Sequence, residues 1–414
     1  MPDTVCSLPL DFGLLEQQLT ERVNAKFAFK LFASHPYLLA AAGVSLSNAQ
    51  QIQMQEVISA VESVIALTAY QNQVLRWAPE LAQVPMGPLG VFMGYDFHMT
   101  PQGPQLIEIN SNAGGAMLNA VLCAAFNLQL SGLQTIHRDV NFDALFLDMF
   151  RQEFAHQRGD QPLESIAIVD SEPPLQYLYP EFVLFAESFM RLGVPTFVVD
   201  PSELTLHNDQ LFFKQQRIDL VYNRLTDFTL ADPKHAALRE AYLRKAVVLT
   251  PNPRVHALYA DKRNLTVLGN DELLKEWGVP ETTRQILTRG ILETRQVSLQ
   301  QAEFFWNSRA QWFFKPFGGF GGKAVYRGKR VTRGVFNTIV SGGYLAQRYC
   351  PANECALQHI ENNSMFKIDW RNYVYAGRVQ LIAARLYQGQ VTNFRTPGGG
   401  YAPAYALDSR ALER

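Results

Sequence analysis

The sequence has little that would place the protein in a membrane, outside the cell or on nucleic acid. Its 414 residues include four cysteines, none in a CxxC pair, so we expect reduced thiols rather than a disulfide framework. No apolar run reaches about 18 residues, and the first residues lack the basic and apolar regions of a signal peptide. The 37 Lys and Arg residues nearly balance the 38 Asp and Glu residues, so no overall positive charge attracts nucleic acid or an anionic membrane. We therefore expect a cytoplasmic protein with neither of these partners.

Several common catalytic motifs are also missing. The chain has no GxGxxG dinucleotide motif and no Walker A motif. It has no GxSxG motif, and its eight histidines show no metal-ligand spacing, so nucleophilic catalysis and a histidine metal site are not expected. The composition, 47% hydrophobic and 18% charged, is that of a globular enzyme.

The pattern along the chain predicts an α/β (α+β) protein with four parts. Residues 1–88 repeat apolar residues at three- and four-residue spacing, which predicts a helical region. Residues 89–160 begin with strand-like runs and return to helix. Residues 161–250 alternate strands and helices, as in a small Rossmann-like unit. Residues 251–414 combine helices, strands and a glycine-rich loop.

One predicted hairpin, "GYDFHMTPQGPQLIEIN" (94–110), holds two carboxylates and an amide. If its turn centres on Gln102, Asp96 faces Glu108, and Asn110 shares a face with Glu108. Opposed like charges are destabilising, so we expect either a raised pKa or a bound cation. Two carboxylates and an amide oxygen suit Mg²⁺. The alternative is a hairpin whose acids face water.

A second candidate is the glycine-rich stretch "WFFKPFGGFGGKAVYRG" (312–328). Glycine lets backbone N–H groups approach phosphate oxygens, and Lys315, just before the loop, is placed to reach a phosphate. An ordinary glycine-rich hairpin is the alternative. The loop glycines are Gly318, Gly319, Gly321 and Gly322.

Three further stretches carry isolated basic residues. Lys262 lies at the predicted helix start in "ADKRNL", where a solvated lysine is the alternative. Period-two spacing puts Lys367, Asp369 and Arg371 on one face of a strand, which also suits an exposed salt-bridged edge. Arg395 in "TNFRTPGGG" can clamp a phosphate or carboxylate with two hydrogen bonds.

Together these motifs resemble an ATP-grasp ligase, in the circularly permuted arrangement of the glutathionylspermidine synthase C-terminal domain. That family has a G-R-F-D-F hairpin leading to E-x-N, and "GYDF…EIN" is similar to it. The resemblance implies a circularly permuted ATP-grasp fold with a pre-ATP-grasp subdomain, and places Asp96, Glu108 and Asn110 as Mg²⁺ ligands. Gly94 stands where the family has an arginine that contacts the acyl substrate.

The resemblance also implies the nucleotide contacts. Lys262, Lys315 and the glycine-rich loop correspond to the family's ATP-binding elements. "YLAQRY" resembles its hinge strand, with Gln347 near adenine. "TNFRT" is similar to its S-R-F segment, which places Arg395 near phosphate. Arg371 and Arg395 are then candidates for binding the transferred phosphoryl group or the acyl carboxylate.

The function implied is an ATP- and Mg²⁺-dependent ligase that joins a small-molecule carboxylate to an amine or thiol. ATP would phosphorylate the carboxylate and leave as ADP, and attack of the amine or thiol on the acyl phosphate would release phosphate. A small-molecule kinase and an inactive ATP-binding module are the alternatives. The substrates and the oligomeric state stay open.

Overall fold

The computed structural model describes residues 7–129, 136–319, 324–357 and 364–406. The helices are α1 (Phe12–Arg22), α2 (Ala25–Ser34), α3 (Asn48–Ile65), α4 (Thr68–Leu75), α5 (Ala116–Gln129), α6 (Phe142–Arg158), α7 (Tyr179–Arg191), α8 (Ala236–Leu243), α9 (Pro253–Tyr259), α10 (Asn264–Leu268), α11 (Asp271–Glu276), α12 (Glu281–Gly290), α13 (Ala302–Ser308) and α14 (Arg333–Val340). The strands are β1 (Ser7–Pro9), β2 (Ala42–Ser45), β3 (Met93–Thr100), β4 (Gly103–Asn110), β5 (Ile166–Val169), β6 (Thr196–Val199), β7 (Leu204–His207), β8 (Gln210–Phe213), β9 (Gln216–Ile218), β10 (Leu220–Asn223), β11 (Val248–Thr250), β12 (Thr294–Gln296), β13 (Trp312–Pro316), β14 (Tyr326–Arg327), β15 (Tyr344–Arg348), β16 (Asn353–Ala356), β17 (Met365–Tyr375), β18 (Arg378–Tyr387) and β19 (Gly400–Tyr405).

The largest sheet joins segments from both ends of the chain. Its order is β1-β2-β19-β18-β17-β3-β4, with β16 paired to β17. Neighbours are antiparallel except for the parallel pair β2 and β19. The prediction of a helical region over residues 1–88 missed β1 and β2, because strands of three or four residues are too short to show a period.

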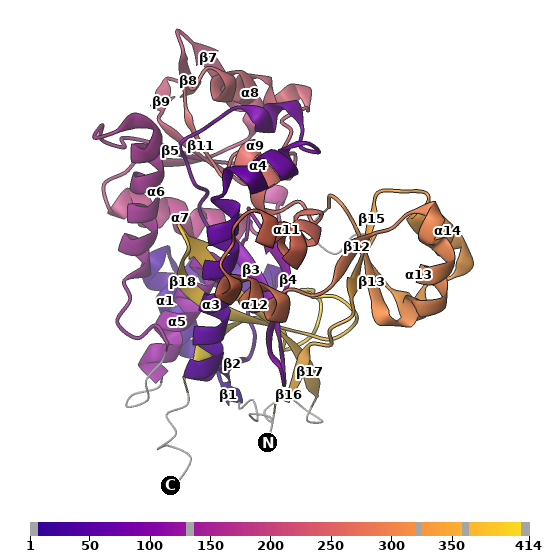
Figure 1. Cartoon of the computed structure of the whole chain (residues 1–414). Coiled ribbons are helices and arrows are strands. Elements are labelled where there is room, and N and C mark those ends of the chain that lie inside the picture. Colours follow the sequence, from indigo (N-terminus) through magenta and orange to yellow (C-terminus); the bar gives the residue numbers. More distant parts are fainter. Residues whose placement is uncertain (1–6, 130–135, 320–323, 358–363, 407–414) are drawn as a thin grey trace.

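Helices cover both faces of this sheet (Figure 1). Tyr373 and Tyr401 point into one core, which α1, α5, α6 and α7 complete. Val374 and Ala402 point into the opposite core, which contains buried residues of α3, α4 and α9. This alternation follows from the two-residue period of a strand. No helix among the described residues is long and apolar enough to cross a membrane.

A parallel sheet of order β11-β10-β5-β6 follows in the chain. Helix α7 leads from β5 to β6, and α8 precedes β11. The connections reverse direction between β5 and β10, and the crevice at the carboxyl ends of strands at such a point is the usual ligand position in α/β sheets. The small antiparallel sheet β7-β8-β9 lies at one end of this unit (Figure 1).

A smaller unit, residues 294–349, projects from the body, and we call it the lobe (Figure 1). Its sheet has the order β12-β15-β13-β14. Trp312 and Phe314 of β13 pack with Phe305 of α13 and Phe336 of α14 into a separate core. Lys315, one residue after Phe314, therefore points to the opposite face, toward the body.

Candidate active site

The predicted hairpin is formed by β3 and β4, and its register is the expected one from Gly94 to Asp96. Asp96 lies directly opposite Glu108, and the register shifts by one residue just beyond Asp96. The Asn110 side-chain amide donates to Asp96 Oδ2 at 3.0 Å and to Glu108 Oε1 at 3.3 Å. The structure thus brings all three predicted metal ligands together.

Two arginines neutralise Asp96. Arg371 donates from Nε to Oδ1 at 2.7 Å and from Nη2 to Oδ2 at 2.6 Å, and Arg385 Nη2 lies 2.8 Å from Oδ2. Asp96 is 1% exposed. The hairpin was expected to need a raised pKa or a bound cation, but arginines from β17 and β18 remove the repulsion instead. Arg371 lies opposite Asp96 in the β3–β17 pair.

Arg385, which the sequence analysis missed, extends this network. It also binds Asp369, its partner across β17 and β18, and Asp369 accepts a 2.8 Å hydrogen bond from Thr392. Burial raises the pKa of Asp369, although Arg385 opposes the shift. Only the pairing of β17 with β18 reveals Arg385, because no local motif surrounds it.

Glu108 is the ionised carboxylate of the site. Burial alone would raise its pKa, but Lys262, Lys315 and Arg385 outweigh burial and lower the pKa to about 2. A raised pKa, one of the two outcomes expected for the hairpin, is therefore wrong for Glu108. The result is a fixed negative charge facing positive side chains.

Lys315 and Gln347 meet the hairpin at one atom. Lys315 Nζ and Gln347 Nε2 each donate to the Ile107 carbonyl oxygen at 3.1 Å. Lys315 is 6% exposed, and burial lowers its pKa to about 8, with Glu108 opposing the shift. These two side chains join the lobe to the peptide unit just before Glu108.

Lys262 lies in the turn before α10 and contacts the glycine-rich segment. Its Nζ donates to the Gly319 carbonyl at 2.9 Å. Gly318 and Gly319 are exposed, and Gly319 has a φ of +136°, which side-chain-bearing residues rarely adopt. Gly321 and Gly322 lie outside the described residues.

Arg395 is not brought into this cluster. It lies on an exposed turn after β18, where its backbone N–H donates to Asn393 at 3.0 Å. Among the described residues, its side chain makes no hydrogen bond or ion pair. Thr392, three residues earlier, ties the same turn to Asp369.

Gly94 is closely packed against the site. A Cβ at this position would lie 2.5 Å from the Ala113 Cβ and 3.4 Å from Arg371 Nε. The Arg371 side chain therefore flanks the position where the resembled family has an arginine, and there is no room for a side chain at Gly94 itself.

A second set of polar residues lies at the carboxyl edge of the parallel sheet. Asp170 follows β5, and Arg224 follows β10. Arg224 is buried, donates to Tyr222 Oη at 3.1 Å and bonds to Asn112, just beyond the hairpin. Burial raises the pKa of Asp170 to about 6, although Arg224 opposes the shift. Sequence reasoning missed both residues, and their position directly after "IAIV" and "LVYN" was the available signal.

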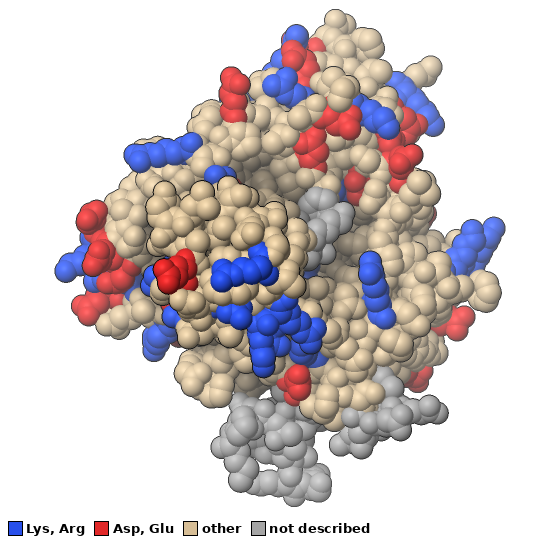
Figure 2. All heavy atoms as spheres, turned by 90° about the vertical axis from the view of Figure 1, so that its right-hand side faces the viewer, with Lys and Arg blue, Asp and Glu red and all other residues tan. Residues whose placement is uncertain are grey.

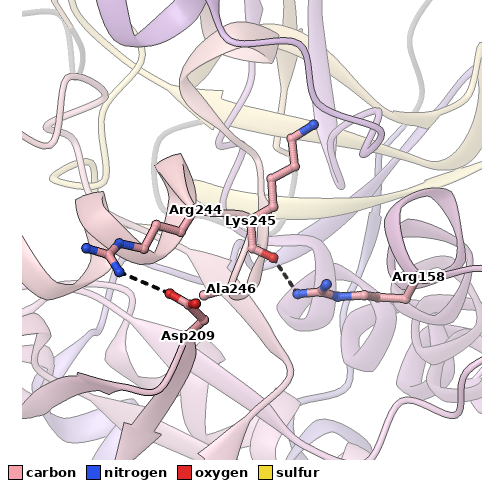
Figure 3. A pocket seen from close by; sticks show the side chains of 5 residues that line it. All are labelled: Arg158, Asp209, Arg244, Lys245 and Ala246. Carbon is pink, nitrogen blue, oxygen red and sulfur yellow. Dashed lines mark hydrogen bonds and ion pairs between the residues drawn. The ribbon is translucent and has the colours of Figure 1, made fainter.

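A shallow pocket of about 540 Å³ lies at the opposite, amino edge of this sheet. Figure 3 shows Arg244 directed at Asp209 and Arg158 at the carbonyl of Lys245. Arg244 also pairs with Glu240. Because its arginines have partners within the chain, we place no ligand there.

No protein-family model matches the chain, and no curated protein matches it. A solved structure of a glutathione synthetase-like effector (GSS30) from Globodera pallida is similar, with a TM-score of 0.57 and 11% identity over 96% of this chain and 97% of that one. A protein of Methylobacillus flagellatus KT, predicted to be a gamma-glutamylcysteine synthetase, gives a TM-score of 0.49 at 10% identity over 86% and 88% of the two chains. The ATP-grasp ligase PsnB in complex with minimal precursor, Mg and ADP gives 0.28 at 14% identity over 60% and 91%.

The likeness to the Globodera protein concerns the fold, since the identity is only 11%. It agrees with the mixed α/β class that the sequence predicted. The circularly permuted arrangement, the subdomain limits and the roles of single residues stay predictions. This chain therefore has a fold similar to that of a glutathione synthetase-like protein.

Proposed function

We propose that the protein is an ATP- and Mg²⁺-dependent ligase that joins a carboxylate to an amine or thiol through an acyl phosphate. The observation that carries the proposal is the meeting of Lys262, Lys315 and the Gly318–Gly319 segment with the ionised Glu108. Two lysines and backbone amides suit a polyphosphate, and a neighbouring carboxylate suits the cation that accompanies it. The fold likeness supports the same assignment.

The residues present fit Mg²⁺ with two protein ligands rather than the three that the sequence predicted. Asp96 has both oxygens engaged by arginines and Asn110, so its role is to hold the Asn110 amide. Glu108 and the Asn110 carbonyl oxygen would then hold Mg²⁺, with phosphate oxygens and water completing its shell. When bound, ATP would supply the phosphoryl group and the cation would neutralise the charge of the phosphates.

The chain's own residues bind and orient the reactants. Lys262 and Lys315 offset the negative charge of the phosphates, and Gln347 fixes the Ile107 peptide from the lobe side. Arg371, held by Asp96, keeps its guanidinium group fixed beside Gly94. Preorganised charges of this kind stabilise the transition state without reorganising during the reaction.

For the acyl substrate we propose a position at the carboxyl edge of the parallel sheet. Arg224 reaches Asn112, two residues beyond Asn110, so this edge adjoins the metal-binding hairpin. The buried Arg224 guanidinium suits a substrate carboxylate, and Asp170 suits an amine. Arg395, on its exposed turn, remains a candidate contact for phosphate or substrate.

The test is ADP release in the presence of carboxylate and amine pairs, with products identified by mass spectrometry. Glu108→Gln and Lys315→Ala should each abolish most of the turnover, whereas Lys245→Gln, at the opposite edge of the parallel sheet, should not. Full activity in both site variants would refute the assignment. A stable phosphorylated product without an amide or thioester would indicate the kinase alternative.

A further inference from the structure

The lobe is strongly basic, although the chain as a whole is not. Residues 294–349 contain nine Lys or Arg residues and a single acidic residue, Glu303, although the whole chain has a net charge of −1. The rest of the chain is therefore net acidic. Figure 2 shows Lys and Arg side chains gathered on the face of the lobe turned toward the viewer.

Four of these residues lie on neighbouring segments, and we call them the basic patch: Arg309, Lys329, Arg330 and Arg333. The guanidinium carbons of Arg309 and Arg333 lie 4.1 Å and 3.8 Å from the ring centre of Trp306. Gly328 packs so closely on the Arg309 backbone that a Cβ there would lie 1.8 Å from the Arg309 carbonyl oxygen. This contact brings Lys329 and Arg330 next to Arg309.

Within the part of the chain that the structure describes, the basic patch forms no ion pair with an acidic residue. Among the described residues of the lobe, the ion pairs join Arg295 and Arg348 to Glu293, at 2.5 Å and 2.7 Å, and none involves the patch. Arg333 is the first residue of α14, whose first turn contains no acid. The helix dipole disfavours a cation at that end. Four like charges thus lie close together at a helix start, where carboxylates would stabilise the fold better. An arrangement that lowers stability in this way is typical of a binding surface.

We propose that the basic patch docks an acidic segment of a partner protein, a surface separate from the ligase site proposed above. The stacking on Trp306 holds two guanidiniums in place, and such preorganised groups lose less entropy when they bind carboxylates through paired hydrogen bonds. A peptide with several carboxylates matches a patch of four cations.

A nucleic acid fits this surface less well. Single-stranded nucleic acids bind through free aromatic faces as well as charge, but the Trp306 ring is already stacked with Arg309 and Arg333. The net acidic remainder of the chain also repels a long polyanion. A short acidic segment contacts the lobe alone.

The experiment measures binding of a fluorescein-labelled peptide of about ten glutamates to the full chain by fluorescence anisotropy at low salt. The triple variant Lys329→Gln/Arg330→Gln/Arg333→Gln should bind about tenfold more weakly, the effect of removing three exposed ion pairs. The matched control, Arg158→Gln/Arg244→Gln/Lys245→Gln, removes the same charge at the pocket of Figure 3 and should bind as the unaltered chain does.

Three outcomes would overturn the proposal. The peptide does not bind the unaltered chain, or the two triple variants lose affinity equally, which would indicate a general charge effect. In the third, a single-stranded oligonucleotide of the same charge binds more tightly than the peptide and loses affinity in the patch variant, which would assign the surface to nucleic acid. Circular dichroism of both variants establishes that they are folded.

Discussion

The charge on Glu108 is predicted to stabilise the fold even without a ligand. Its pKa falls from the usual 4.5 to about 2 because Lys262 and Lys315 favour the ionised form. That difference corresponds to about 3 kcal/mol. Glu108 is only half-buried, so solvent screening reduces the expected value to about 2 kcal/mol. Glu108→Gln, which removes the charge and keeps the shape, should lower the free energy of unfolding by that amount at pH 7.

The stabilisation by Glu108 should depend on pH in a defined direction. A carboxyl group whose pKa is lowered by folding stabilises the folded state above its usual pKa, and this stabilisation is lost as the pH falls toward the folded value. The difference between the unaltered chain and Glu108→Gln should therefore be complete at about pH 7 and smaller at about pH 3.5. Urea unfolding followed by tryptophan fluorescence measures it.

The control is Glu354→Gln, which removes an exposed carboxylate on β16. It should change the free energy of unfolding by less than about 0.5 kcal/mol at either pH. A Glu108→Gln effect that matches the control, or one that stays constant between the two pH values, would refute the coupling of Glu108 to the lysines.

Three other predictions concern the same region. ATP binding, measured by calorimetry, should weaken as the pH rises through about 8, because Lys315 loses its proton there. Lys315→Arg should remove this pH dependence, and an unchanged pH profile in the variant would contradict the prediction. Asp96→Asn leaves the buried Arg371 without its charged partner and leaves Arg385 with Asp369 alone, so it should cost about 3–5 kcal/mol in urea unfolding; a loss under about 1 kcal/mol would show that the pairing is dispensable. Gly94→Ala should cost about 1–3 kcal/mol because its Cβ meets that of Ala113, and Ala113→Gly in the same chain should restore stability if this contact is the cause.

The hairpin was predictable from sequence because its information is local. Period-two alternation and a Pro/Gly turn indicate which residues face each other, although the pairing of Asp96 with Glu108 also depends on a register shift between Asp96 and Phe97 that the sequence does not specify. The two-residue period also places Asn110 on the same face as Glu108, which accounts for its hydrogen bonds to Asp96 and Glu108. The glycine-rich segment could likewise be found by composition, although part of it lies outside the described residues.

The neutralisation of Asp96 was not predictable in this way. Arg371 is separated from Asp96 by 275 residues, and only the pairing of β17 with β3 makes them neighbours. Arg385 requires one more strand pairing. The group formed by Arg224 and Asp170 depends on the order of a parallel sheet, which residue types do not specify. Long-range pairing, rather than local preference, thus determined the unpredicted half of the site.

The shared acceptor at Ile107 has a mechanical consequence. Lys315 and Gln347, both on the lobe, hold one carbonyl oxygen of the body. Moving the lobe outward would break both hydrogen bonds at once, leave the buried Lys315 ammonium without this acceptor and remove one of the three positive charges that lower the pKa of Glu108. The position of the lobe and the pKa of Glu108 are therefore coupled. A spin label on the lobe and the titration of Glu108 should report on the same movement.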